Sequence, residues 1–206
     1  MLLDVAWPSP KSHACVRGWR YDESVTVEDV ANVSAGRTVP EHLPVGGTRW
    51  REWILGRRAV DDALQAVKQP LMPVLLAPSG APMFPDPEWS VSISHTRGLV
   101  LAVVAPVPVG IDVESSQRDV SRLARVVLAS ERVMVQEIGL LAALVAKEAA
   151  SKSLGQGLHE GVRRWPIVDT SLDSNGRYVT VASPDGKSVG VHVWENLGYV
   201  TGLACE

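Results

Sequence analysis

Apolar residues recur at helical spacing between residues 48 and 68. They follow three- and four-residue steps at Trp50, Trp53, Ile54, Val60, Ala63, Leu64 and Val67. This spacing predicts an amphipathic helix, with Thr48 as its N-cap and Pro70 as a stop signal. Four arginines on the helix (Arg49, Arg51, Arg57 and Arg58) fit a solvated face when the helix is taken alone.

Less regular segments lie on both sides of this helix. Residues 1–47 are rich in Pro, Gly and Ser with scattered apolar residues, so short strands and loops are expected there. Residues 71–89 are rich in proline and predict an extended loop.

A two-residue period replaces the helical one after residue 89. Residues 90–95 alternate strictly, and residues 99–105 are almost all apolar. These patterns predict a half-buried strand followed by a strand that is buried on both faces. After a break at residues 106–108, a third strand is expected at residues 109–114.

This third expected strand carries two carboxylates. Because side chains alternate across a strand, Asp112 and Glu114 share one face with Gly110, and the Val109 side faces the core. Exposed acidic residues are common near strand ends, so this pair alone is weak evidence for a site.

A second charged cluster lies in a helix expected at residues 137–154, which Gly155 ends. Glu148 and Lys152 are four residues apart and share a face, in line with the apolar residues Leu141 and Val145. Alone, such a pair is an ordinary ion pair on a helix surface. Three carboxylates and a lysine that converge on a cleft favour a hard-cation site that holds phosphates.

The rest of the chain predicts short helices and a strand meander. A short helix is expected at residues 121–128, and another helical segment begins at 130–132. The expected strands cover residues 162–168, 177–182, 188–194 and 199–204, with a turn at 184–187. Strands and helices alternate in both halves, which predicts an α+β fold with a boundary near residues 106–108. We therefore expect an N-terminal half at 1–107 and a C-terminal half at 108–206.

Composition narrows the classes of protein. The formal net charge of the 206 residues is −3, which argues against nucleic acid as the main partner. Cys15 and Cys205 lack metal-like spacing and fit free thiols in the cytosol. The N-terminus does not resemble a signal peptide, and the most apolar stretch, residues 99–113, is too short to span a bilayer. These features predict a soluble, cytoplasmic protein.

Several short motifs follow one another in a characteristic order. They are Ser92-Ile93-Ser94-His95, Gly110-Ile111-Asp112-Val113-Glu114 and Lys147-Glu148-Ala149-x-x-Lys152, preceded by Gly56-Arg57-Arg58-Ala59 and Pro82-x-x-Pro85. Their order and spacing resemble the 4′-phosphopantetheinyl transferases, in particular the larger, monomeric surfactin/enterobactin-synthetase type. The resemblance covers residues 48–160 or so. One departure is Ser79, which stands where this family usually has a basic residue.

This resemblance implies two halves related by a pseudo-twofold axis, with the active site between them. It also implies transfer of the 4′-phosphopantetheine group of coenzyme A to a serine of an apo acyl or peptidyl carrier protein, with release of 3′,5′-ADP. Asp112, Glu114 and Glu148 would hold Mg²⁺ or Mn²⁺. The carrier could belong to fatty-acid, polyketide or nonribosomal-peptide synthesis.

The resemblance gives roles to further residues. Glu148 would accept the proton of the carrier serine, Lys152 would neutralise phosphate charge, and His95 is counted with them as catalytic. Ser94, His95 and Lys152 would contact coenzyme A phosphates, and Arg49 and Arg57 would bind its nucleotide end. A non-catalytic scaffold of the same fold that binds coenzyme A or a carrier domain is the alternative.

Overall fold

The computed structural model describes residues 2–6, 13–33, 39–158, 161–173 and 176–205. Expectations for residues 7–12 and 34–38 lie outside this described part. The fold mixes helices with two main antiparallel sheets, so the α+β prediction is confirmed. No helix in the described part is long and apolar enough to cross a membrane.

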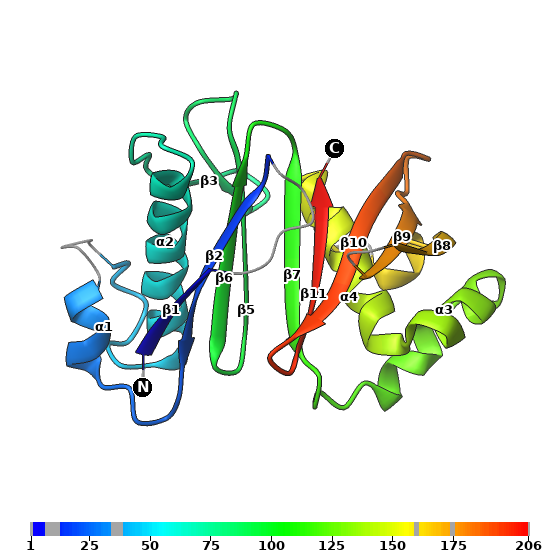
Figure 1. Ribbon diagram of the computed structural model, residues 1–206, viewed down its shortest axis with the longest axis horizontal. Coiled ribbons are helices and arrows are strands. Elements are labelled where there is room, and N and C mark those ends of the chain that lie inside the picture. Colours follow the sequence, from blue (N-terminus) through cyan, green and yellow to red (C-terminus); the bar gives the residue numbers. More distant parts are fainter. Residues whose placement is uncertain (1, 7–12, 34–38, 159–160, 174–175, 206) are drawn as a thin grey trace.

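The first sheet is built from the N-terminal part of the chain. Its strands are ordered β1 (Leu2–Ala6), β2 (Cys15–Tyr21), β6 (Leu99–Ala105) and β5 (Ser90–Thr96). Helix α2 (Thr48–Ala66) packs on β6 and β2, and the short helix α1 (Val27–Val33) packs on α2 (Figure 1). All of β6 is buried, as its apolar sequence predicts. Strands were expected before residue 47, but α1 was not.

Helix α2 confirms the helical pattern but not its predicted ends. Gly47 is the N-cap, because Thr48 is already the first helical residue. The helix ends at Ala66, before Pro70, because Lys68 adopts a positive φ of 59°. At Gly56 the helix passes close to β5, since an added Cβ would lie 3.1 Å from Cγ2 of Ile93.

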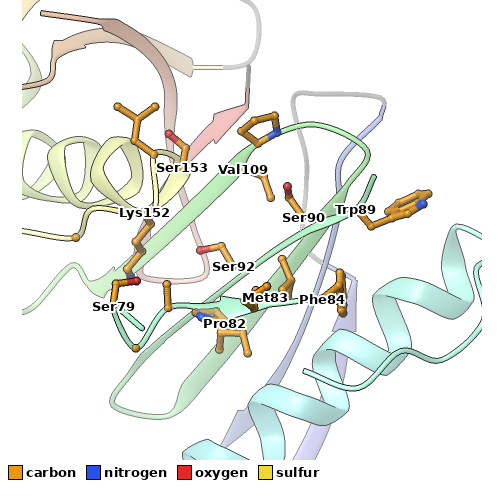
Figure 2. A pocket seen from close by; sticks show the side chains of 18 of the residues that line it. Ser79, Pro82, Met83, Phe84, Trp89, Ser90, Ser92, Val109, Lys152 and Ser153 are labelled. Carbon is orange, nitrogen blue, oxygen red and sulfur yellow. The ribbon is translucent and has the colours of Figure 1, made fainter. Parts of the chain in front are cut away.

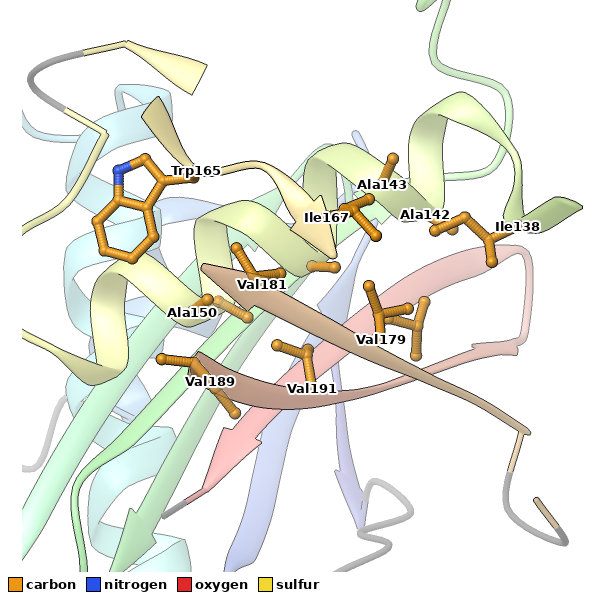
Figure 3. Close-up of a cluster of buried hydrophobic side chains, with 14 of the residues drawn as sticks. Ile138, Ala142, Ala143, Ala150, Trp165, Ile167, Val179, Val181, Val189 and Val191 are labelled. Atoms are coloured by element: carbon orange, nitrogen blue, oxygen red, sulfur yellow. The ribbon is translucent and has the colours of Figure 1, made fainter. Parts of the chain in front are cut away.

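A second antiparallel sheet contains the C-terminal strands. Its order is β7 (Val109–Ser115), β11 (Tyr199–Cys205), β10 (Ser188–Asn196), β9 (Gly176–Ala182) and β8 (Ile167–Asp173). Helix α4 (Leu140–Ser153) covers it, and alanines such as Ala142 and Ala150 pack against valines of β9 and β10 such as Val179 and Val191 (Figure 3). This core fixes the helix that carries Glu148 and Lys152.

Two predictions for this half are wrong in detail. The helix expected at 137–154 is two helices, α3 (Arg132–Ile138) and α4, because Gly139 between them adopts a φ of 88°. The strand expected at 162–168 begins at Ile167, since the 3₁₀ turn η3 (Val162–Arg164) occupies the first residues. The other three meander strands are confirmed.

The remaining elements are short. The helix expected at 121–128 is the 3₁₀ helix η1 (Ser121–Val126), and η2 (Ala129–Glu131) leads into α3. The proline-rich segment holds a two-stranded pair, β3 (Leu75–Leu76) and β4 (Pro82–Met83), with turns between the two strands and after β4.

Helix α4 lies very close to strand β7. A Cβ added at Gly110 would lie 2.1 Å from the carbonyl oxygen of Ala149 and 2.4 Å from the amide nitrogen of Ser153. Real Cβ atoms do not approach backbone so closely, so this contact requires glycine. Gly110 therefore allows the last turns of α4 to lie beside the carboxylates of β7.

Candidate active site at the junction of the two sheets

Strands β5 and β7 lie side by side where the two sheets meet (Figure 1). Hydroxyl groups from β5 bridge the junction. Ser92 Oγ accepts a hydrogen bond from the amide of Ile111, at 3.1 Å. Ser94 Oγ accepts one from the amide of Val113, at 3.3 Å, and donates to Oδ1 of Asp112 at 2.8 Å. Side chains thus satisfy strand-edge amides that would otherwise be buried without partners.

Lys152 brings two of the predicted carboxylates together. Its Nζ lies 2.8 Å from Oδ1 of Asp112 and 3.5 Å from Oε1 of Glu148. The same nitrogen lies 3.3 Å from Oγ of Ser94. Asp112 is buried at the junction, whereas Glu148 is partly exposed. Asp112, Glu148, Lys152 and Ser94 therefore form one polar cluster drawn from β5, β7 and α4.

The carboxylates of this cluster could bind an additional positive charge. Oδ2 of Asp112 is buried and has no hydrogen-bond partner among the described residues. Burial raises the pKa of Glu148, and the negative charge of Asp112 raises it further, while Lys152 opposes both effects. A cation beside these oxygens would relieve both conditions. The donor set therefore fits a divalent cation.

Glu114, the third predicted metal ligand, has other partners. Thr96 Oγ1 donates to its Oε2 at 3.1 Å, and Arg118 forms an ion pair with its Oε1. Within the described ranges, no group of three or more His, Cys, Asp or Glu side chains is arranged to hold a metal. Mg²⁺ is commonly bound by one or two carboxylates together with substrate phosphates, so Asp112 and Glu148 alone fit it.

The residues expected at the nucleotide end of coenzyme A line one cavity. Arg49, Arg57 and His95 share a cavity of about 500 Å³ with Glu52 and Trp53. Nδ1 of His95 lies 3.3 Å from Oε1 of Glu52. Ser94 does not line this cavity, because it points into the junction toward Asp112. The structure thus groups three of the predicted contacts and sets Ser94 apart.

A neighbouring cavity of about 620 Å³ reaches Lys152 (Figure 2). Ser79 lies near Lys152 at one end, and Phe84 and Trp89 lie toward the other. Both cavities are lined by Gly80, Pro82 and Ile93, so they adjoin. Together they extend from Arg49 to Lys152. Ser79 lines the Lys152 side rather than the cavity that holds the arginines.

Two features of the site were not predicted. The first is the row of hydroxyls that joins the sheets; its signal in the sequence was Ser92, Ser94 and Thr96 at every second position. The second is a buried ion pair between Lys147 and Glu131, 2.7 Å apart. Burial lowers the pKa of Lys147, and Glu131 partly offsets this effect.

The side chain of Glu131 is fully buried and connects three segments of the chain through its carboxylate. Besides Lys147, its carboxylate accepts hydrogen bonds from the amides of Leu128, at 2.9 Å, and Ile167, at 2.8 Å. Lys147 therefore points into the core of the second sheet, although it directly precedes Glu148 in the motif. Its position fixes α4 rather than contributing charge to the cavities.

Comparison with known families gives one match. Residues 46–105 match the family model of the 4′-phosphopantetheinyl transferase N-terminal domain. The matched segment includes α2, the proline-rich segment, β5 and β6, and covers under a third of the chain. No match is found among curated proteins. The family match supports a relationship of this segment to the 4′-phosphopantetheinyl transferases.

Proposed function

We propose that this protein is a 4′-phosphopantetheinyl transferase of the surfactin/enterobactin-synthetase type. It would transfer the phosphopantetheine group of coenzyme A to a serine of an apo acyl or peptidyl carrier protein, and release 3′,5′-ADP. The observation that carries this proposal is the cluster of Asp112, Glu148 and Lys152, whose lysine lines one of two adjoining cavities. Arg49 and Arg57 line the other end.

Charge complementarity supports coenzyme A as the substrate. Arg49, Arg57 and His95 would meet the nucleotide end and its 3′-phosphate. Lys152 would meet the diphosphate. Asp112 and Glu148, with Glu114 beside them, would hold Mg²⁺ or Mn²⁺, which would neutralise charge on the diphosphate when bound.

The positions of Glu148 and Lys152 suit the transfer step. Glu148 would take the proton of the carrier serine as general base. The serine oxygen would form a bond to the phosphorus that bears pantetheine. The bond from this phosphorus to the bridging oxygen would break and release 3′,5′-ADP. Lys152 would stabilise the negative charge on the phosphate oxygens.

The arrangement of the chain fits this proposal. We place the boundary between the halves at residues 107 and 108, between β6 and β7, and propose that a pseudo-twofold axis relates them. Each half has an antiparallel sheet with one long helix against it, α2 in the first and α4 in the second. The site lies where the halves meet. We further propose that the protein acts as a cytoplasmic monomer.

Intact-mass analysis of apo carrier proteins tests the proposal directly. The purified protein is incubated with coenzyme A, Mg²⁺ and a panel of fatty-acid, polyketide and nonribosomal-peptide carriers. An enzyme adds the mass of phosphopantetheine to at least one carrier, and mutation of that carrier's acceptor serine abolishes the addition. A non-catalytic scaffold of the same fold would bind coenzyme A or carrier without any change in mass.

A further inference from the structure

Trp53 occupies a position that the sequence pattern does not explain. Helical spacing places it with Trp50 and Ile54 on the apolar face of α2. Trp50 and Ile54 are buried, at 5% and 1% exposure, but Trp53 is only partly buried and lines the 500 Å³ cavity. An aromatic side chain at a cavity wall is available to a ligand, whereas its two neighbours form core.

Arg57 lies directly over this ring. Its guanidinium carbon is 4.2 Å from the centre of the Trp53 ring, a cation–π contact. The two residues are four apart on α2, so the helix holds both on one face. The contact places the guanidinium of Arg57 over the indole of Trp53, and both lie beside Arg49 and His95 in the same cavity.

We propose that the ring of Trp53, held in place by Arg57, forms the platform for the purine base of the nucleotide, and that Trp53 determines specificity for purine over pyrimidine. This inference rests on the proposed function, which brings a nucleotide to this cavity. Bases stack on aromatic side chains. Leu43, Leu76 and Ile93 complete the cavity with apolar surface, which suits the faces and edges of a base.

Different residues would then supply the stacking surface for the base and the positive charge for the phosphates. Arg49, Arg57 and His95 attract the phosphates whichever base the nucleotide bears. Trp53 has no charge, so its contribution depends on the base alone. Removal of one aromatic platform typically costs a ligand about ten- to a hundredfold in affinity. A bicyclic purine overlaps a stacking surface more than a pyrimidine does. Loss of that surface should therefore reduce the affinity for a purine nucleotide more.

Calorimetric titration of the full chain tests this proposal with three probes: 3′,5′-ADP, uridine 3′,5′-bisphosphate and inorganic pyrophosphate. Wild type should bind 3′,5′-ADP more tightly than the uridine compound. Trp53→Leu should weaken 3′,5′-ADP about tenfold or more, remove the preference for purine and leave pyrophosphate unchanged. Trp53→Phe should keep most of the preference and serves if Trp53→Leu does not fold. Trp194→Leu changes a partly buried tryptophan outside the described cavities and should change none of the three affinities.

The remaining outcomes are also decisive. Equal losses for all three probes in Trp53→Leu would show that Trp53 only holds Arg57 in place, and would overturn the platform. An unchanged purine preference would overturn it as well. Failure of wild type to bind coenzyme A or 3′,5′-ADP at all would instead refute the proposed function, on which this inference rests.

Discussion

The ammonium nitrogen of Lys152 lies 2.8 Å from Oδ1 of Asp112, across the packing contact between helix α4 and strand β7. Forty residues separate the two in sequence. Asp112 is almost completely buried, and its second carboxylate oxygen has no hydrogen-bond partner among the described residues. In the absence of a metal ion, Lys152 is thus the cation that compensates this buried charge. The first two predictions follow from this pair.

Replacement of Lys152 by Met should make folding depend on divalent ions. The variant leaves Asp112 and Ser94 without the ammonium, and an unpaired buried charge costs about 1–3 kcal/mol or more. In excess chelator, urea unfolding should show a loss of this size. Mg²⁺ should restore much of it, because a ligand that binds only the native state raises stability. Equal stability with chelator and with Mg²⁺ would contradict a cation site at Asp112.

Replacement of Asp112 by Ala should abolish transfer. Without Asp112, the site loses one of the two carboxylates that could bind a metal. Carrier modification measured by intact mass should fall below detection, and excess chelator should have the same effect on wild type. Asp119→Ala is the control, since this exposed loop carboxylate accepts a hydrogen bond from the amide of nearby Ser121. Full wild-type activity in chelator would refute the metal assignment.

The reaction should depend on Glu148 far more than folding does. If Glu148 were only one half of a helix ion pair, Glu148→Gln would cost well under about 1 kcal/mol and leave turnover intact. As the proposed base and ligand, its loss should reduce turnover about 10²-fold or more. Initial rates of carrier modification, with circular dichroism as the check on folding, separate the two roles. Near-normal turnover would favour the simple ion pair.

Sequence patterns predicted strands and helices correctly where the local period of apolar residues agrees with the long-range packing. Strands β5, β6 and β7 and helix α2 lie where alternation and helical spacing predict them. Strand β5 departs from its pattern in one respect, because Ser92 and Ser94 on its polar face are buried as well. The meeting of Asp112, Glu148 and Lys152 also follows from the sequence. Its physical cause is Gly110, which lets α4 approach the strand.

The rest of the site depends on hydrogen-bond and ion-pair partners that the spacing of residues in the sequence does not reveal. Glu114 shares a strand face with Asp112, yet it accepts a hydrogen bond from Thr96 and forms an ion pair with Arg118. Ser94 was expected at a phosphate, but its hydroxyl satisfies the amide of Val113 and the carboxylate of Asp112 in the interior. Such choices are decided by hydrogen-bonding demand in the assembled fold. Likewise Gly139 interrupts a helical pattern that its neighbours continue.

Glu148 should also make stability depend on pH when no metal is present. Its pKa in the folded protein is raised above the ordinary value of 4.5 for a glutamate, so between these two values the folded state binds more protons than the unfolded state. The free energy of unfolding of wild type should therefore fall as pH rises through this window. Glu148→Gln lacks this loss and should gain stability relative to wild type there, and keep the gain at higher pH.

The size of this gain is limited by exposure. The side chain of Glu148 is 37% exposed, so water screens its charge and the gain should stay under about 1 kcal/mol. Melting temperatures of both proteins in chelator, from pH 4 upward, measure the difference. A variant that loses stability relative to wild type as pH rises would show that Lys152 outweighs burial and Asp112.

Arg57 and Arg58 offer a matched pair for the nucleotide end of coenzyme A. Arg57 lines the 500 Å³ cavity, whereas Nε of its neighbour Arg58 lies 2.9 Å from Oδ1 of Asp62 in an ion pair within α2. A charge-assisted contact to the 3′-phosphate is worth about 1.5–3 kcal/mol, or about ten- to a hundredfold in affinity. Arg57→Ala should therefore weaken coenzyme A by this factor and weaken dephospho-coenzyme A much less. Arg58→Ala should change neither affinity, and calorimetric titration of both ligands measures all four values. Equal losses on the two ligands in Arg57→Ala would mean that this guanidinium does not contact the 3′-phosphate.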